Sequence, residues 1–136
     1  MQRIFLDANV LLSAAYRPGA GLVQLGRLKD TRFFTSRYAH WEATANLECE
    51  EQRLRLDELS GKLQFCEAGS RTPPREVSLP DKDMPILLAA LAASCTHLLT
   101  GDLRHFGPYL GKKIEGMFVT LPGDYLKTRH RESIRE

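Results

Sequence analysis

The sequence is poor in cysteine and contains no long apolar run. Its three cysteines, Cys49, Cys66 and Cys95, are odd in number and lack the paired spacing of a structural zinc site. We therefore expect reduced thiols without structural zinc, with Cys95 buried in a helix. No stretch approaches the roughly 18 to 20 apolar residues that cross a bilayer, and the chain enters an apolar segment at once without a signal peptide. These absences predict a cytoplasmic protein that makes no contact with a membrane.

The residue combinations that serve as nucleophilic catalysts in many hydrolases are also missing. The sequence shows no Ser–His–Asp or Cys–His arrangement, and it contains no internal repeat or low-complexity tract. Its 136 residues, of which 43% are hydrophobic and 26% charged, have the length and composition of one globular domain. We expect that domain to span residues 1–126, followed by a basic tail at residues 127–136 that begins with "KTRHR".

Strand-like and helix-like segments alternate along the chain. Residues 2–6 are predicted to form a strand buried on both faces, because Ile4, Phe5 and Leu6 are consecutive apolar residues. Further strands are predicted at "RFFTS", "HLLT" and "GMFVT", and the loop "EAGSRTPPREVSLP" is expected to contain a short strand near Val77. Helices are predicted from about Asn9 and through "YAHWEATANLECE", "QRLRLDELSGKLQF", with Gly61 as a breaker, and "DMPILLAALAASCT". This alternation predicts a three-layer α/β/α sandwich around a mainly parallel sheet.

Two acids follow predicted strands directly. Asp7 comes after the first strand, and Asp102 comes after "HLLTG". Ligands of open parallel sheets bind beyond the carboxyl ends of the strands, so we expect both side chains at the same edge. Asp83 lies at the start of the helix that precedes "HLLT", and Glu42 lies in the helix after "RFFTS". Spacing alone does not say whether these two acids reach that edge.

A cluster of these acids would need a cation or protons. Two unit charges about 4 Å apart repel by about 4 kcal/mol at an effective dielectric constant of about 20. Oxygen ligands alone favour Mg²⁺ or Mn²⁺ over zinc, and Asn9 and Thr100 add neutral oxygens that could hold metal-bound waters. Such an ion activates water and stabilises negative charge on a phosphodiester, so the pattern favours phosphodiester hydrolysis.

Each acid also has a plainer interpretation. Asp7 could cap a helix, Asp83 could do the same, and Asp102 could belong to a simple turn. Glu42 could lie on a solvated helix face, and Asp81 could replace Asp83 as the ligand because "DKD" offers two acids.

Two other functions remain open at this point. One is a phosphohydrolase or phospho-acceptor domain that uses Asp7 as a covalent nucleophile. A haloacid dehalogenase would have a second aspartate two residues later, where this chain has Asn9. The other is a catalytically silent module that binds RNA or a protein.

Four segments resemble the motifs of the PIN domain family, which includes the VapC-type toxins of bacterial toxin–antitoxin pairs. They are "FLDANVLLSA", the glutamate in "HWEATANL", "DKDMPILLAAL" and "HLLTGDLRHF". The resemblance implies a PIN-like fold and a Mg²⁺- or Mn²⁺-dependent endoribonuclease. It also implies an RNA substrate, an antitoxin partner and a homodimer. The catalytic and metal-binding quartet that it implies is Asp7, Glu42, Asp83 and Asp102, with Asn9 and Thr100 as supporting polar residues.

The chain departs from the family pattern just after "TGD". Many PIN domains have a further acid there, whereas this chain has Arg104 and His105. This departure leaves open whether the site holds one metal ion or two. We interpret Arg104 and His105 as candidate contacts to a substrate phosphate.

Overall fold

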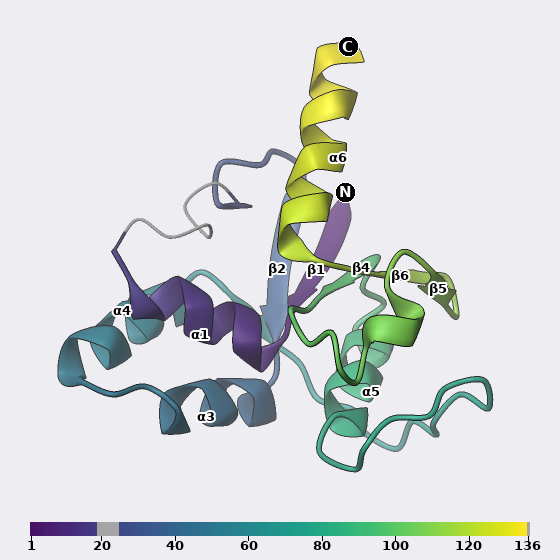
Figure 1. Cartoon of the computed structure of the whole chain (residues 1–136), viewed down its shortest axis with the longest axis horizontal. Helices are drawn as coiled ribbons and strands as arrows, with labels where there is room; N and C mark the ends of the chain where they lie inside the picture. Colours follow the sequence, from purple (N-terminus) through teal and green to yellow (C-terminus); the bar gives the residue numbers. More distant parts are fainter. Residues whose placement is uncertain (19–24, 136) are drawn as a thin grey trace.

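The computed structural model in Figure 1 describes residues 1–18 and 25–135. The first half of the chain contains β1 (Gln2–Leu6), α1 (Ala8–Tyr16), β2 (Thr31–Thr35), α3 (Arg37–Ala45), α4 (Glu50–Ser60) and β3 (Gln64–Phe65). The second half contains α5 (Met84–Ala92), β4 (His97–Leu99), the 3₁₀ helix η1 (Gly107–Tyr109), β5 (Lys113–Ile114), β6 (Met117–Thr120) and α6 (Pro122–Arg135). None of the helices in these two stretches combines the length and the apolar composition that crossing a membrane requires.

The strands within the described residues form one six-stranded sheet in the order β3-β2-β1-β4-β6-β5. Every neighbouring pair is parallel except β5 and β6, which are antiparallel. In the centre of the sheet, Phe5 of β1 pairs with Phe34 of β2 on one side and with Leu98 of β4 on the other. The carboxyl ends of β1, β2 and β4 therefore meet at one edge, as the predicted mainly parallel sheet requires.

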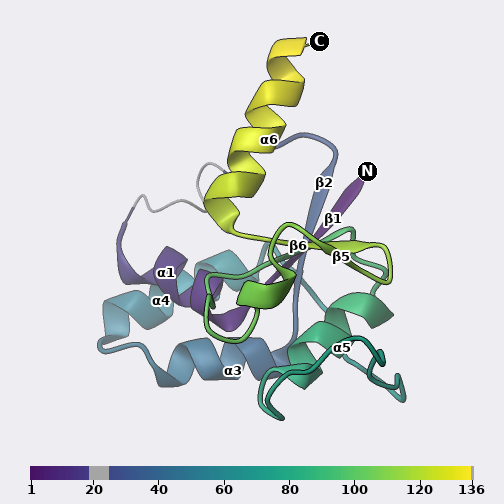
Figure 2. The same cartoon turned by 45° about the vertical axis from the view of Figure 1, so that its right-hand side comes forward.

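Helices cover both faces of this sheet. In Figures 1 and 2, α1 and α4 lie on one side of the central strands and α5 lies on the other. Strand β1 is completely buried between these layers at Ile4, Phe5 and Leu6. The small residues Ala89 and Ala90 of α5 are also buried, which lets that helix lie close to the sheet. The predicted three-layer α/β/α architecture is therefore confirmed.

The helix predicted through "YAHWEATANLECE" is shorter than expected. It begins as predicted, because the Ser36 hydroxyl accepts a hydrogen bond from the backbone N–H of Ala39. It ends at Ala45, and α4 begins separately at Glu50. The Gln52 side-chain oxygen accepts hydrogen bonds from the backbone N–H groups at positions 48 and 49, at 2.7 and 3.3 Å. This capping interaction starts a new helix and explains the break.

Three local predictions in the middle of the chain are each wrong in part. The segment around Val77 is a loop, although the Val77 side chain is buried. Helix α4 ends before Gly61, the predicted breaker, but Gln64–Phe65 beyond it form the short strand β3 instead of helix, because these residues pair with the edge of β2. Cys95 is buried as predicted but lies in the turn after α5 rather than in a helix. That turn is set by Ser94, whose φ of 55° ends the helix.

The predicted basic tail is helical over its described part. Helix α6 runs from Pro122 to Arg135, so the predicted domain boundary after residue 126 falls inside it. Figure 1 shows its last turns projecting away from the sheet. The Arg129 guanidinium donates hydrogen bonds to the Gln2 side chain at 2.9 Å and to the Lys29 carbonyl at 2.9 Å. These bonds fasten α6 to the amino ends of β1 and β2, opposite the edge that carries the acids.

Candidate metal centre

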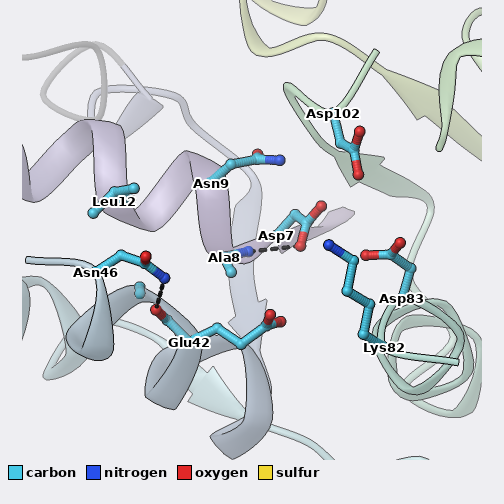
Figure 3. A pocket seen from close by; sticks show the side chains of 10 residues that line it. Asp7, Ala8, Asn9, Leu12, Glu42, Asn46, Lys82, Asp83 and Asp102 are labelled. Carbon is cyan, nitrogen blue, oxygen red and sulfur yellow. Dashed lines mark hydrogen bonds between the residues drawn. The ribbon is translucent and has the colours of Figure 1, made fainter. Parts of the chain in front are cut away.

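The four acids singled out from the sequence converge on one pocket. It has a volume of about 170 Å³, enough for a hydrated metal ion, and lies where β1 and β4 end (Figure 3). Its lining comprises Asp7, Ala8, Asn9, Leu12, Glu42, Ala43, Asn46, Lys82, Asp83 and Asp102. Asp81 is exposed and is not among the lining residues, so the structure places Asp83 rather than Asp81 in the pocket.

Asp7 is the most buried of the four carboxylates, with 3% of its surface exposed. It occupies the N-cap of α1, and its Oδ1 accepts a hydrogen bond from the backbone N–H of Ala8 at 2.7 Å. Its Oδ2 accepts one from the Thr100 hydroxyl, also at 2.7 Å. Burial raises the pKa of Asp7 to about 6. The nearby charges of Asp83 and Glu42 add to the rise, and the two hydrogen bonds oppose it.

Asn9 and Thr100 hold the loop after β4 against the start of α1. The Thr100 hydroxyl oxygen, which donates to Asp7, also accepts from the backbone N–H of Asp102 at 3.1 Å. The Asn9 side-chain oxygen accepts from the backbone N–H of Gly101 at 2.9 Å. The oxygens that we expected to hold metal-bound waters are therefore engaged in fixing Asp7 and Asp102 relative to each other.

Replacing Thr100 with valine should separate this positioning role from simple packing. Valine keeps the shape but leaves Asp7 Oδ2 and the Asp102 N–H without their shared partner. We expect the free energy of unfolding, measured by urea titration, to fall by about 1–3 kcal/mol. We also expect divalent-ion affinity, measured by calorimetry, to fall by at least about tenfold.

Thr35→Val is the matched control for that measurement. Thr35 is equally buried, but its hydroxyl donates to the Leu6 carbonyl and touches none of the acids. The Thr35→Val variant should lose about as much stability as Thr100→Val but keep the metal affinity of the wild type. Equal metal affinities in the two variants would contradict the positioning role of Thr100.

Asp83 lies at the N-cap of α5 but does not cap it. Its side chain makes no capping hydrogen bond, so the plainer interpretation does not account for its orientation. Asp83 Oδ2 lies 3.0 Å from the Nδ1 atom of His105. That oxygen is shielded from solvent and has no hydrogen-bond partner. A buried carboxylate oxygen without a partner is costly, and a bound cation would satisfy it.

Asp102 is held by its own turn. Its Oδ1 accepts hydrogen bonds from the backbone N–H groups of Arg104 and His105 at 3.1 and 3.0 Å, and its Oδ2 lies 2.9 Å from His105 Nδ1. Burial acts to raise the pKa of Asp102, but the hydrogen bonds and charge of His105 and the Arg104 N–H leave it below its ordinary value. Asp102 is therefore a carboxylate that stays ionised.

The remaining electrostatics show an excess of negative charge. Burial raises the pKa of Asp83, and the charge of Asp102 adds to this effect while His105 and Lys82 oppose it. Burial also raises the pKa of Glu42, with a further contribution from Asp83 and opposition from Lys82. Lys82, which we did not single out from the sequence, is thus a cation beside four acids. Its position between two acids in "DKD" was the available signal.

The residues present fit a divalent metal ion. Among the described residues, the candidate ligand atoms that lie within 4.8 Å of one another belong to Asp83, Asp102 and His105, whereas Asp7 and Glu42 line the same pocket outside that group. Four carboxylates share one small pocket, three of them have raised pKa values, and one buried oxygen lacks a hydrogen bond. Carboxylate oxygens are the ligands that Mg²⁺ and Mn²⁺ prefer. The structure does not place the two residues interpreted as phosphate contacts, Arg104 and His105, among those that line the pocket. Arg104 is exposed and does not line the pocket, and His105 faces Asp83 and Asp102 instead of open solvent.

Comparison with known proteins gives the fold but not a close relative. No protein-family model and no curated protein matches the sequence. A chain from the structure of VapBC2 of Rickettsia felis, bound to a DNA fragment from its promoter, has a TM-score of 0.63 at 14% identity. This match covers 88% of the present chain and 98% of that one.

The structure of VapBC-1 from nontypeable Haemophilus influenzae contains a second similar chain. Its TM-score is 0.56 at 14% identity, and the match covers 90% of the present chain and 99% of that one. At this identity the likeness shows the fold, and it confirms the PIN-like fold expected from the sequence motifs.

Proposed function

We propose that the protein is a metal-dependent endoribonuclease of the VapC type, the toxin of a toxin–antitoxin pair. Asp7, Glu42, Asp83 and Asp102 would hold Mg²⁺ or Mn²⁺ and carry the hydrolysis of RNA phosphodiesters. The convergence of these four acids, from four separate segments, on one pocket at the carboxyl edge of the sheet carries this proposal. The fold shared with the two VapBC structures supports it.

Each side chain of the pocket has its own role in the proposed reaction. A bound divalent ion supplies an activated water and stabilises the charge that develops on the phosphodiester. Asp83 would offer an oxygen that has no hydrogen-bond partner, and Asp102 would offer a carboxylate whose pKa is lowered by its hydrogen bonds. Hydrogen bonds to both of its oxygens fix the orientation of Asp7, and Glu42 reaches the pocket from α3. Lys82 can bind a phosphate oxygen of the substrate at the pocket rim.

The other two functions are less well supported. Both oxygens of Asp7 already accept hydrogen bonds, and Asn9 is bonded to Gly101, which does not favour Asp7 as a nucleophile. A silent RNA-binding module would not require four acids around an unpaired carboxylate oxygen, because acids repel a phosphate backbone.

A cleavage assay with a matched pair of glutamates tests the proposal. Purified protein is incubated with total bacterial RNA in Mn²⁺, in Mg²⁺ or in EDTA, and new RNA ends are mapped by sequencing. We expect internal cleavage with metal and none in EDTA. Glu42→Gln should lower the rate by at least about tenfold, because a metal-bound charge is lost. Glu58→Gln, an exposed position on α4, should leave the rate unchanged.

Two outcomes of this assay would reject the proposal. Cleavage that persists in EDTA would exclude the metal mechanism. Intact RNA under all conditions, with a folded protein that retains metal binding, would favour the silent binding module.

The partner and the assembly state are part of the same proposal. The similar structures are named as VapBC assemblies, so we propose an antitoxin that covers the acidic pocket and a homodimer of this chain. Trp41 on α3 has 65% of its surface exposed, so it is not a core residue and is available to a partner. Light scattering of the purified chain should give twice the monomer mass of 15.4 kDa, and a monomer mass would contradict the dimer.

A further inference from the structure

The turn after β4 places the imidazole ring of His105 beside two acids of the pocket, Asp83 and Asp102. The Asp102 side chain accepts hydrogen bonds from the backbone at positions 104 and 105, and its carbonyl accepts one from the Phe106 N–H at 3.1 Å. Phe106 is completely buried and anchors the turn in the core. His105 is therefore fixed at both of its neighbours, and 21% of its side chain is exposed.

The contacts of His105 are those of a ring placed between two carboxylates. Its Nδ1 lies 2.9 Å from Asp102 Oδ2 and 3.0 Å from Asp83 Oδ2. Nδ1 can donate at most one hydrogen, so the ring can satisfy only one of these two oxygens. Asp83 Oδ2 is left without a hydrogen bond, although more than nine-tenths of Asp83 is buried. This shielded, unpaired oxygen points to a cation that is shared with the ring.

The spacing of the three atoms suits a metal ion. Ligand atoms of Asp83, Asp102 and His105 all lie within 4.8 Å of one another. Adjacent ligands of a six-coordinate ion with bonds of about 2.1 Å lie about 3 Å apart. The two nitrogen–oxygen separations of 2.9 and 3.0 Å match that value.

We propose that His105 Nδ1 is a metal ligand together with Asp83 and Asp102, and that this nitrogen makes the site prefer Mn²⁺ over Mg²⁺. The inference rests on the metal pocket of the proposed function, not on RNA cleavage. Mg²⁺ favours oxygen ligands and keeps its waters, whereas imidazole binds first-row transition ions well. When Nδ1 binds a metal ion, the imidazole carries its hydrogen on Nε2, and any hydrogen on Nδ1 leaves to solvent as a proton.

Metal affinities of three proteins test the selectivity. Calorimetry gives the dissociation constants for Mn²⁺ and Mg²⁺ of the wild type, of His105→Asp and of the control His130→Asp, which changes an exposed histidine of α6. We expect the wild type to bind Mn²⁺ at least about tenfold more tightly than Mg²⁺. His105→Asp, with an all-oxygen site, should lose about tenfold of that preference, and His130→Asp should keep it. An unchanged preference in His105→Asp overturns the proposal.

Electron spin-echo spectroscopy of the Mn²⁺-loaded wild type tests the ligand without any variant. A coordinated imidazole gives nitrogen modulation of the echo, which we expect here and in His130→Asp but not in His105→Asp. Its absence from the wild type overturns the proposal even if RNA cleavage is metal-dependent. Its presence supports the proposal even if no RNA is cleaved, so the two failures are distinguishable.

Discussion

The Asp7→Asn variant is expected to lose at least about 100-fold in RNA cleavage while the metal-free protein becomes more stable at neutral pH. A metal ion contributes several kcal/mol of transition-state stabilisation, and each 1.4 kcal/mol is about a factor of ten. Asparagine keeps the size of Asp7 and can still accept from the Ala8 N–H, but it removes a charge from the pocket. The rate is measured with mapped RNA sites in Mn²⁺.

The gain in stability follows from the direction of the pKa shift. The pKa of Asp7 is about 6 in the folded protein, above its ordinary value of 3.8, because burial disfavours the charged form. The folded state therefore holds the proton more tightly. This contribution to stability is complete below about pH 4 and is lost as the pH rises through about 6. Above pH 6, the ionised carboxylate costs about 1–3 kcal/mol, which asparagine removes.

Urea unfolding in EDTA between pH 4 and pH 8 measures this effect. The stability difference between Asp7→Asn and the wild type should grow with pH and level off above about pH 7. Asp57→Asn, at an exposed position on α4, makes the same change of charge and should show no such trend. A constant difference at all pH values, or a variant that is less stable at pH 8, would contradict the claim that ionised Asp7 destabilises the metal-free protein.

Replacing Phe106 with alanine should produce the largest loss of stability near the site. Phe106 is completely buried, and truncating such a side chain costs about 3–5 kcal/mol. The same change frees the turn that orients Asp102 and His105. Mn²⁺ affinity should therefore fall together with the free energy of unfolding, measured by calorimetry and urea titration.

Leu103→Ala is the control within the same turn. Leu103 has 64% of its surface exposed, so its truncation should change stability by no more than about 0.5 kcal/mol and leave Mn²⁺ affinity intact. If Phe106→Ala does not fold, the milder Phe106→Leu should show the same two losses at smaller size. A Phe106 variant with wild-type stability would show that the turn is not anchored in the core.

The central part of the fold was predictable because its signals are local. The consecutive apolar residues Ile4, Phe5 and Leu6 mark a strand covered on both faces, and the structure buries all three completely. The break between α3 and α4 was not predictable in the same way, because it depends on where the Gln52 side chain folds back. The two-residue strand β3 depends on pairing with the edge of β2, which is a tertiary contact.

In the site too, some residues could be predicted from local sequence signals and others depend on tertiary contacts. Asp7 and Asp102 could be placed together because each follows a parallel strand, and parallel strands end at one edge. Asp83 and Glu42 could be named as candidates, but only the family resemblance assigned them to the site, since their spacing does not determine the positions of the helices that carry them. The contact between His105 and the acids was missed. The direction of that ring depends on the turn bonded to Asp102 and on the burial of Phe106.

The central claim is that separate acids form one binding site for a divalent cation. Titration of the wild type and of the double variant Asp83→Asn/Asp102→Asn with Mn²⁺, followed by calorimetry at pH 7.5, tests it most directly. Circular dichroism confirms that both proteins are folded. The account predicts saturable binding to the wild type and a loss of at least about 100-fold in affinity in the double variant. Equal affinities, or a folded wild type that binds no Mn²⁺, would contradict it.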